Sequence, residues 1–598
     1  MTIYKAPLAD FSFLFDRVLR LDALSNVPGF AEASGDTRGA ILEEAGKLSE
    51  GVLLPLNESG DREGCRYDAK THSVTTPKGF KEAYRQFTEG GWSGLASDPD
   101  YGGQGLPAVL ALAVNEMVVA TNWSFAMYPG LSHGAYSAIH THGSEEQKAT
   151  YLPKLVAGEW SGTMNLTEPQ CGTDLGLIRT KAEPQKDGSY RITGTKIWIS
   201  GGEQDLTANA IHLVLARISG APEGIKGISL FIVPKFLVNA DGTLGARNGV
   251  FCGGLEEKMG IHANATCVMN YEGATGYLIG EPHKGMRAMF TMMNEARLGV
   301  GLQGLAISEI AYQNAVAFAR ERLQGRSLTG PKNEGGPADP IIVHPDVRRM
   351  LMDVRAFNEG ARALLLWTGL WGDLEYRSSD AKTREKGGDY MALLTPVLKA
   401  YFTDQGFQSA VTCQQVLGGS GFTKHFPIEQ FVRDARIGMI YEGANGIQAL
   451  DLVGRKLAQN GGRALFAFLA DAGEVADALV ARPEFKAYGD RLHETRKFLE
   501  DATKWLMENA LANPDHAGAS SYDYLYLTAY VALGLVWGRM VLAARKALDE
   551  GAGEKAFFEA KLVTARHFFE RVLPAAQVHA VRAKAGADGL MALAAEAF

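Results

Sequence analysis

The hydrophobic pattern changes its period twice along the chain, and this change limits the fold more than any other feature. Between residues 161 and 280, apolar residues recur at about every second position, as in Tyr190–Ser200 and Ile211–Arg217, which is typical of β-strands. Further apolar runs follow at Ile228–Val233 and Ala265–Tyr271. Since no helix-length segment lies between these runs, an antiparallel sheet or small barrel is favoured over a parallel array.

Helical patterns flank this β region on both sides. Before it, we expect helices at about 36–56, 79–90 and 109–120, and a capping box formed by Ser144 and Gln147 for a helix that ends near Ala157. After it, four long helices indicate a bundle; they are expected at Met286–Glu321, from about Val347 to Leu364, at Met391–Leu417 and at Ile447–Leu457. Further apolar helices are expected at 494–511, 523–549 and 555–572.

A chain of 598 residues is too long for a single hydrophobic core. We therefore predict a multidomain α+β protein. Its four domains are an N-terminal helical domain (1–160), a middle antiparallel β-barrel domain (161–280), a four-helix bundle (281–460) and an added C-terminal α domain (461–598).

Composition excludes several functional classes. The net charge of -8, from 60 basic and 68 acidic residues, disfavours nonspecific binding to nucleic acid. The five cysteines lie far apart without CxxC spacing, so neither a metal site nor a disulfide framework is expected, and a reducing compartment such as the cytoplasm fits. No signal peptide is expected at Met1–Asp16.

One uncharged apolar run, Tyr524–Gly538, resembles part of a membrane span. It has 15 residues, whereas a transmembrane helix needs about 20. A buried helix is favoured, and contact with a membrane surface is the alternative.

Five segments in the same order carry a resemblance to a known family. They are Gly91–Leu106, Gly143–Trp160, Leu166–Asp174, Gly194–Ser200, and Leu417–Phe422 with Arg433–Ala435 and Ile440–Gly443. Their order and spacing across about residues 80–457 resemble the acyl-CoA dehydrogenase family. The length, the C-terminal helical region and Tyr4–Pro7 are similar to a longer branch, which includes 3-methylmercaptopropionyl-CoA dehydrogenases and bacterial long-chain enzymes.

The resemblance implies FAD-dependent α,β-dehydrogenation of an acyl-CoA thioester to the trans-2-enoyl-CoA. Glu442, by its place in Tyr441-Glu442-Gly443, would remove the α proton while flavin N5 takes the β hydride. The α proton is weakly acidic, so the reaction needs a carboxylate shielded from water and hydrogen-bond donors at the thioester oxygen. The resemblance assigns these donors to the Glu442 amide and a flavin ribityl hydroxyl. The alternative for Glu442 is an ordinary helix-end or surface glutamate.

The resemblance also implies further binding residues and no metal ion. The flavin ring would contact Met164, Leu166, Thr167, Trp198 and Ser200, with Thr173 near the flavin or CoA. The flavin pyrophosphate would meet Arg322, and the adenosine half of a flavin bound by a second subunit would meet Gln415, Val416 and Gly419. The substrate would contact Thr173, Asn294, Arg297 and Gly443, with Arg297 at the adenine–phosphate end of CoA. The alternatives are a sheet-core tryptophan for Trp198, a turn threonine for Thr173, a surface arginine for Arg297 and a tight turn at Gly418-Gly419.

Two positions depart from the family pattern. Gly325 stands where an aromatic residue is usual, which removes a stacking contact near the adenosine end. Ala444 and Gly446 lack side chains that could bond a flavin phosphate or ribose, so either Asn445 or backbone amides substitute, or this contact is absent.

Partners and competing functions follow from the same resemblance. It implies electron-transfer flavoprotein as the electron acceptor, and a homodimer or dimer of dimers. Both 3-methylmercaptopropionyl-CoA and medium- or long-chain fatty acyl-CoA are candidate substrates. The other functions considered are an acyl-CoA oxidase that uses oxygen and a flavin-binding scaffold without turnover.

Overall fold

The computed structural model describes residues 2–598, which divide into two compact units. Unit 1 contains the residues up to Glu43, Pro107–Glu116 and Val300–Phe598, and unit 2 contains Glu44–Leu106 and Met117–Gly299. Three of the four boundaries between the units fall inside helices, which are α2 (Gly35–Leu48), α5 (Ala108–Thr121) and α8 (Gly285–Glu321), and the fourth lies between Leu106 and Pro107, just before α5.

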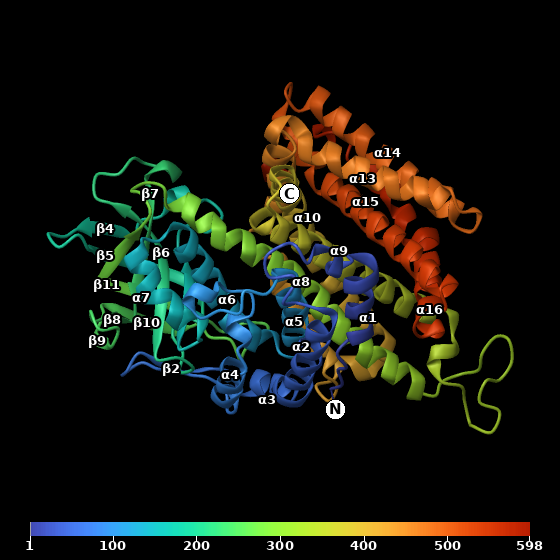
Figure 1. Ribbon diagram of the computed structural model, residues 1–598, viewed down its shortest axis with the longest axis horizontal. Coiled ribbons are helices and arrows are strands. Elements are labelled where there is room, and N and C mark those ends of the chain that lie inside the picture. The colour runs from blue at the N-terminus through green and yellow to red at the C-terminus, as the bar shows by residue number, and fades with distance from the viewer. Residues whose placement is uncertain (1) are drawn as a thin grey trace. The chain divides into compact units, whose positions relative to one another are not determined.

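The β region of unit 2 forms a closed barrel (Figure 1). Its principal strands are β3 (Trp160–Asn165), β4 (Lys181–Pro184), β5 (Tyr190–Ser200), β6 (Asn209–Ile218), β7 (Ile228–Pro234), β10 (Val250–Leu255) and β11 (Thr266–Ile279). The ring closes because β11 pairs with β5, β5 with β4, β4 with β6, β6 with β7, and β7 with β11. Strand β3 pairs with β6, and β10 pairs with β11.

The predicted barrel is confirmed, but its strand directions are mixed. β3 and β4 each run parallel to β6, whereas a wholly antiparallel sheet was expected. The chain passes through a loop, β4 and β5 before it returns as β6, and such a long connection permits parallel pairing. β7 is buried at all seven positions, which explains why its sequence is a continuous apolar run rather than an alternating one.

Helices and two small hairpins complete unit 2. The helices wholly inside this unit are α3 (Leu54–Glu63), α4 (Phe80–Glu89), α6 (Trp123–His142) and α7 (Glu145–Val156). The hairpins are β1 (Arg66–Asp68) with β2 (Ser73–Thr75), and β8 (Phe236–Val238) with β9 (Leu244–Arg247). The capping box of α7 is confirmed, because the Ser144 hydroxyl accepts from the Gln147 amide at 3.2 Å and the Gln147 side chain accepts from the Ser144 amide at 3.1 Å.

Unit 1 is helical throughout. Besides the parts of α2, α5 and α8 that belong to it, its helices are α1 (Leu8–Ser12), α9 (Pro345–Arg377), α10 (Ala381–Leu417), α11 (Ile428–Ala435), α12 (Asn445–Asp451), α13 (Arg463–Val480), α14 (Lys486–Asn509), α15 (Pro514–Asp549), α16 (Lys555–His567), α17 (Ala576–Arg582) and α18 (Asp588–Met591). α9 and α10 pack along each other as expected for a bundle, and the helix predicted at Ile447–Leu457 is present as α12 continued by a π-helix at Leu452–Lys456.

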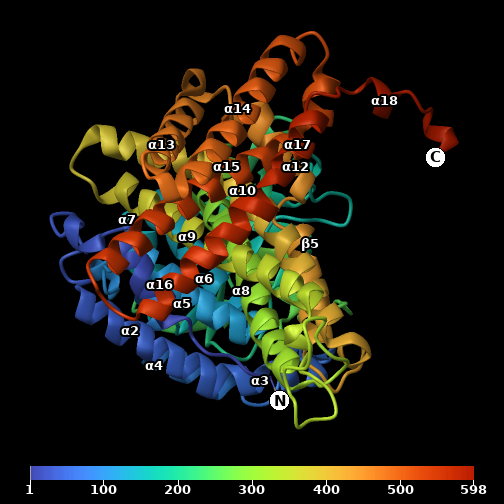
Figure 2. The same cartoon turned by 90° about the vertical axis from the view of Figure 1, so that its right-hand side faces the viewer.

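Helix α15 connects the added helices to the bundle helices of unit 1. α13, α14 and α15 lie side by side in Figure 1. α15 also packs against α10 and α12, whose labels lie next to it in Figure 2. Within residues 2–598, only α15 is long and apolar enough to cross a membrane, and 83% of its most apolar window is buried in the protein. This burial agrees with the predicted buried helix.

Candidate active site

Glu442 lies on a short loop in unit 1 whose backbone adopts an uncommon conformation. The loop joins a 3-10 turn at Arg436–Met439 to helix α12. Glu442 has φ 57° and Gly443 has φ 83°, so two successive residues are left-handed. This conformation is unfavourable by about 1–2 kcal/mol for a residue with a Cβ, and such residues persist only where their surroundings hold them, often at functional sites.

The side chain of Gln448, in the first turns of α12, holds this loop from one side. Gln448 is fully buried and its Nε2 donates to the carbonyl oxygens of Glu442 at 3.2 Å and Gly443 at 3.4 Å. A Cβ on residue 443 would stand 2.6 Å from Gln448 Nε2. Glycine is therefore required at this position both by its backbone angle and by the space available.

Lys399 of helix α10 holds the loop from the other side. Its side chain is fully buried, and Nζ donates to the Gly443 carbonyl at 2.7 Å and to Asn445 Oδ1 at 2.8 Å. Sequence reasoning missed this residue, although a signal was present. Lys399 is the only charge in the apolar stretch Val397–Phe402, and a lysine is rarely buried unless it is paired.

Asn445 anchors the loop within unit 1. Its Nδ2 donates to the Ala400 carbonyl at 3.1 Å, to Thr403 Oγ1 at 3.0 Å and to Asp404 Oδ1 at 2.7 Å. Both the oxygen and the nitrogen of this amide therefore bond residues of helix α10. The Asn445 side chain, one of the substitutes considered for the missing flavin contact, is thus engaged in bonds to α10.

Trp198 in unit 2 lies in a β-bulge of strand β5. Ile197 and Trp198 together oppose the single residue Val268 of β11, where the register shifts. Trp198 has φ 60° and is 61% exposed. A bulge redirects the side chain it carries, so the alternative of a sheet-core tryptophan is wrong.

A buried ion pair joins the Trp198 segment to the Thr167 segment. Lys196 Nζ donates to Glu168 Oε1 and to the Leu166 carbonyl, both at 2.8 Å, and the Ile197 amide donates to the Thr167 carbonyl at 2.9 Å. Burial alone would raise the pKa of Glu168, but Lys196 and the hydrogen bonds from Thr180 and Arg179 lower it to about 2. The structure thus brings together two of the segments that carry predicted flavin contacts.

The other predicted residues of unit 2 differ in exposure. Met164, Thr167 and Ser200 are half-buried, Thr173 and Asn294 are exposed, and Leu166 packs in an apolar cluster. Arg297 on α8 is only 6% exposed, so the alternative of a surface arginine is wrong. The roles of these residues in binding remain predictions.

The remaining predicted residues of unit 1 lie just after α8 (Arg322) and at the end of α10 and the turn that follows it (Gln415, Val416 and Gly419). Arg322, Gln415 and Gly419 are exposed, whereas Val416 is buried. Gly418 has φ 58°, and a Cβ added at Gly418 or Gly419 would meet no atom within 4 Å. The turn is therefore accessible to a ligand or to another chain.

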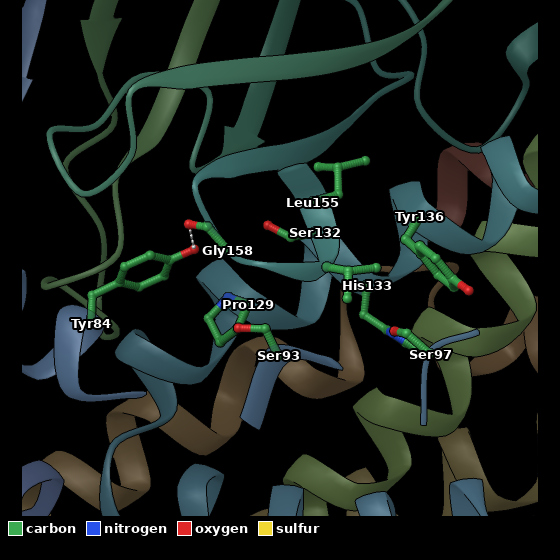
Figure 3. A pocket seen from close by; sticks show the side chains of 10 residues that line it. Tyr84, Ser93, Ser97, Pro129, Ser132, His133, Tyr136, Leu155 and Gly158 are labelled. Atoms are coloured by element: carbon green, nitrogen blue, oxygen red, sulfur yellow. Dashed lines mark hydrogen bonds between the residues drawn. The ribbon is translucent and has the colours of Figure 1, made fainter. Parts of the chain in front are cut away.

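A small pocket in unit 2 has too little room to take part in substrate binding. Figure 3 shows it between Tyr84, Ser132 and Tyr136, with Tyr84 donating to the Gly158 carbonyl at 3.2 Å. Its volume of about 10 Å³ is about that of one water molecule. No group of three His, Cys, Asp or Glu side chains in residues 2–598 is arranged to hold a metal ion.

A test of the Lys196–Glu168 pair is the pH dependence of stability. Glu168→Gln is expected to lower the thermal unfolding midpoint at pH 7 because it removes an ionised partner from Lys196. The pKa of Glu168 is about 2 when folded and 4.5 when unperturbed. The contribution of the carboxylate is therefore complete above about pH 4.5 and is lost as the pH falls toward 2.

Thermal unfolding of Glu168→Gln and the parent protein between pH 7 and pH 3 measures this effect. Glu159→Gln, which breaks an exposed pair with Lys154, is the control and should change the midpoint little. If the difference in unfolding midpoint between Glu168→Gln and the parent stayed constant from pH 7 to pH 3, the Glu168 carboxylate would not contribute to stability as described.

Comparisons with known proteins cover nearly the whole chain. Family models match at residues 41–159 (acyl-CoA dehydrogenase, N-terminal domain), 163–274 (middle domain), 283–457 (C-terminal domain) and 468–594 (acetyl-CoA dehydrogenase C-terminal like). The chain is 42% identical over 574 residues to the 3-methylmercaptopropionyl-CoA dehydrogenase of Ruegeria pomeroyi, covering 95% of this chain and 96% of that protein.

Two further proteins are similar over most of their length. The broad-specificity linear acyl-CoA dehydrogenase FadE5 of Mycobacterium tuberculosis is 36% identical over 592 residues, covering 96% of each chain. The crystal structure of an acyl-CoA dehydrogenase complexed with FAD from Bacillus anthracis matches with a TM-score of 0.74 at 22% identity, covering 92% of this chain and 88% of that one. At that identity the structural match establishes the fold alone.

Proposed function

Because the chain belongs to the acyl-CoA dehydrogenase family of oxidoreductases, we propose that it is an FAD-dependent enzyme that oxidises the Cα–Cβ bond of an acyl-CoA thioester to the trans-2-enoyl-CoA. The observation that supports this most is the loop at Glu442. A carboxylate is held there on a left-handed backbone by Lys399 and Gln448, which bond the carbonyl groups that follow it.

Glu442 acts as the general base. Its carboxylate takes the pro-R α proton of the thioester, and exclusion of water by the bound acyl chain raises its basicity. The Glu442 amide donates to the thioester carbonyl oxygen and stabilises the negative charge that develops there. Bound FAD supplies the hydride acceptor for the β carbon. In this proposal Lys399 and Gln448 fix the backbone that carries both groups.

The residues present fit FAD. In unit 2, the exposed indole of Trp198 and the half-buried Thr167 offer a flat apolar face and a hydroxyl. In unit 1, Gln448 Oε1 is a buried acceptor without a hydrogen-bond partner in residues 2–598, and the open turn at Gly418-Gly419 admits a ligand. Met164, Leu166, Thr173 and Ser200 would complete the ring contacts, and Arg322, Gln415, Val416 and Gly419 those of the pyrophosphate and adenosine.

For the substrate we propose contacts from Thr173, Asn294, Arg297 and Gly443. We favour 3-methylmercaptopropionyl-CoA as the acyl group, since a relative at 42% identity bears that name. A medium- or long-chain fatty acyl-CoA is the second candidate, supported by the broad-specificity linear relative at 36% identity.

For the partners we propose electron-transfer flavoprotein as electron acceptor and a homodimer or dimer of dimers. The oxidase and the non-catalytic scaffold are the competing functions, and the dehydrogenase names of the relatives support neither. Five free cysteines support a reducing compartment, which we propose to be the cytoplasm. We retain the four-domain division at 160, 280 and 460 as a proposal.

Anaerobic mixing with acyl-CoA tests this function. The purified flavoprotein is expected to lose its yellow absorbance with at least one of 3-methylmercaptopropionyl-CoA, butyryl-CoA, octanoyl-CoA and palmitoyl-CoA. The acyl group that reduces the flavin fastest identifies the substrate class. No loss of absorbance with any of the four would contradict both enzymatic functions. Rapid reoxidation in air with release of hydrogen peroxide would favour the oxidase.

A further inference from the structure

A continuous set of polar contacts within unit 1 leads from the Glu442 loop to helix α15. Asp404, just over one turn after Lys399 on α10, accepts from Asn445 Nδ2 at 2.7 Å through Oδ1. Its other oxygen, Oδ2, accepts from the hydroxyl of Tyr526 at 2.9 Å and from that of Tyr522. Tyr522 and Tyr526 lie one turn apart on α15 with stacked rings 5.5 Å between centroids. The added helices are thus bonded to the loop through two side chains of the bundle.

Opposite charges fix the central amide of this set. Lys399 can only donate and the Asp404 carboxylate can only accept, so the Asn445 amide has a single orientation between them. Lys399 is fully buried and Asp404 is 8% exposed. Hydrogen bonds to charged groups are stronger than neutral ones, and a buried charge that loses its partner is strongly destabilised. The set therefore resists local rearrangement as long as every member is present.

The loop needs such support. Left-handed backbone at Glu442 is disfavoured by about 1–2 kcal/mol, and bonds from Gln448 and Lys399 to the loop carbonyls oppose its relaxation. Asn445 and Asp404 hold Lys399 and the start of α12 in place, and the two tyrosines complete the coordination of Asp404. Loss of the tyrosine hydroxyls leaves Asp404 Oδ2 without these donors in a buried site, which favours its movement away from Asn445.

We propose that Tyr522 and Tyr526 are positioning residues for Glu442, acting through Asp404, Asn445 and Lys399, so that the added C-terminal helices take part in dehydrogenation. The proposal rests on the proposed function of Glu442 as the base. It gives the C-terminal region of this longer chain a role in the reaction in addition to packing.

The test compares two tyrosine variants of the same helix. Tyr522→Phe/Tyr526→Phe keeps both rings and removes only the hydroxyls. The control is Tyr524→Phe, whose hydroxyl bonds Thr503 at 2.7 Å outside this set. For each holoenzyme, the rate of anaerobic flavin reduction is measured against acyl-CoA concentration, and hydrogen–deuterium exchange is measured in the peptide covering residues 441–448. Asp404→Asn is a second variant that keeps the size of the side chain and removes its charge.

The double variant is expected to lower the limiting reduction rate about 10- to 100-fold, with little change in the half-saturating acyl-CoA concentration and in FAD content. Hydrogen exchange in the 441–448 peptide should be faster than in the parent. Asp404→Asn should likewise lower the reduction rate and speed exchange in this peptide. Parent-like rate and exchange in the double variant would overturn the proposal. Equal losses in Tyr524→Phe would also overturn it, because they would show a general packing effect.

Failure of the proposed function is distinguishable from failure of this inference. If the parent protein itself is not reduced by any acyl-CoA, the function is wrong. Hydrogen exchange in the 441–448 peptide requires no turnover, so it still decides whether α15 controls the conformation of the loop.

Discussion

Glu442→Gln is expected to slow anaerobic flavin reduction by about two to four orders of magnitude, the contribution typical of a general base. The amide has the size of the carboxylate but cannot accept the α proton. The hydrogen bonds from Lys399 and Gln448 go to the backbone carbonyl groups of Glu442 and Gly443, which the substitution keeps. FAD content and the thermal unfolding midpoint should therefore remain close to those of the parent.

A matched control separates loss of the base from loss of a negative charge. Glu429→Gln on α11 removes a half-buried partner of Arg433 in the same unit, and we expect reduction rates close to the parent. Stopped-flow absorbance under anaerobic conditions measures all three proteins. Reduction of Glu442→Gln at the parental rate would exclude Glu442 as the base, and with it the proposed mechanism.

Elements that depend on local sequence were predicted well. The capping box of α7 and the amphipathic helix α4 rest on side chains within a few residues of one another, so their patterns can be recognised directly. Helix α6 was not predicted because Pro129, Gly130 and Gly134 interrupt it, and these residues usually mark helix ends or loops. Packing against β3 stabilises α6 despite them.

Features that depend on distant partners could not be predicted. An alternating pattern over Tyr190–Ser200 predicts a strand, but the left-handed angle of Trp198 comes from a register shift against β11. The position of Glu442 could be predicted from a motif. The residues that hold it could not, because Lys399 and Asn445 lie 46 residues apart in sequence and Tyr522 lies 118 residues from Asp404. The candidate base was thus predictable and its support was not.

A buried network of charges within unit 1 provides the largest expected effect on stability. The guanidinium of Arg362 on α9 bonds Glu116 of α5 at 2.8 Å, Glu309 of α8 at 2.9 Å and Asp10 of α1 at 2.8 Å. Lys561 of α16 bonds Asp10 as well. The side chain of Arg362 is 1% exposed and that of Glu116 is fully buried. The network therefore joins five helices, and carboxylates of α1, α5 and α8 depend on two buried cations.

Arg362→Met is expected to lower the free energy of unfolding by about 3–5 kcal/mol, because it leaves buried carboxylates without their cation. The loss should be larger at pH 8 than at pH 5. Burial raises the pKa of Glu116 to about 7 even with Arg362 beside it, and removing Arg362 raises it further. The carboxyl can then stay buried only as the neutral acid, and protonating it becomes harder as the pH rises.

Chemical unfolding of Arg362→Met at pH 5 and pH 8 measures both predictions. Arg349→Met on the same helix, which breaks exposed contacts with Asp346 and Asp353, is the control and should change stability by no more than about 1 kcal/mol at either pH. Arg362→Lys retains a cation without the planar guanidinium, so its loss of unfolding free energy should lie between those of Arg362→Met and Arg349→Met. Two outcomes would show that the carboxylates do not depend on this cation. One is a loss of unfolding free energy for Arg362→Met no larger than that for Arg349→Met, and the other is a larger loss at pH 5 than at pH 8.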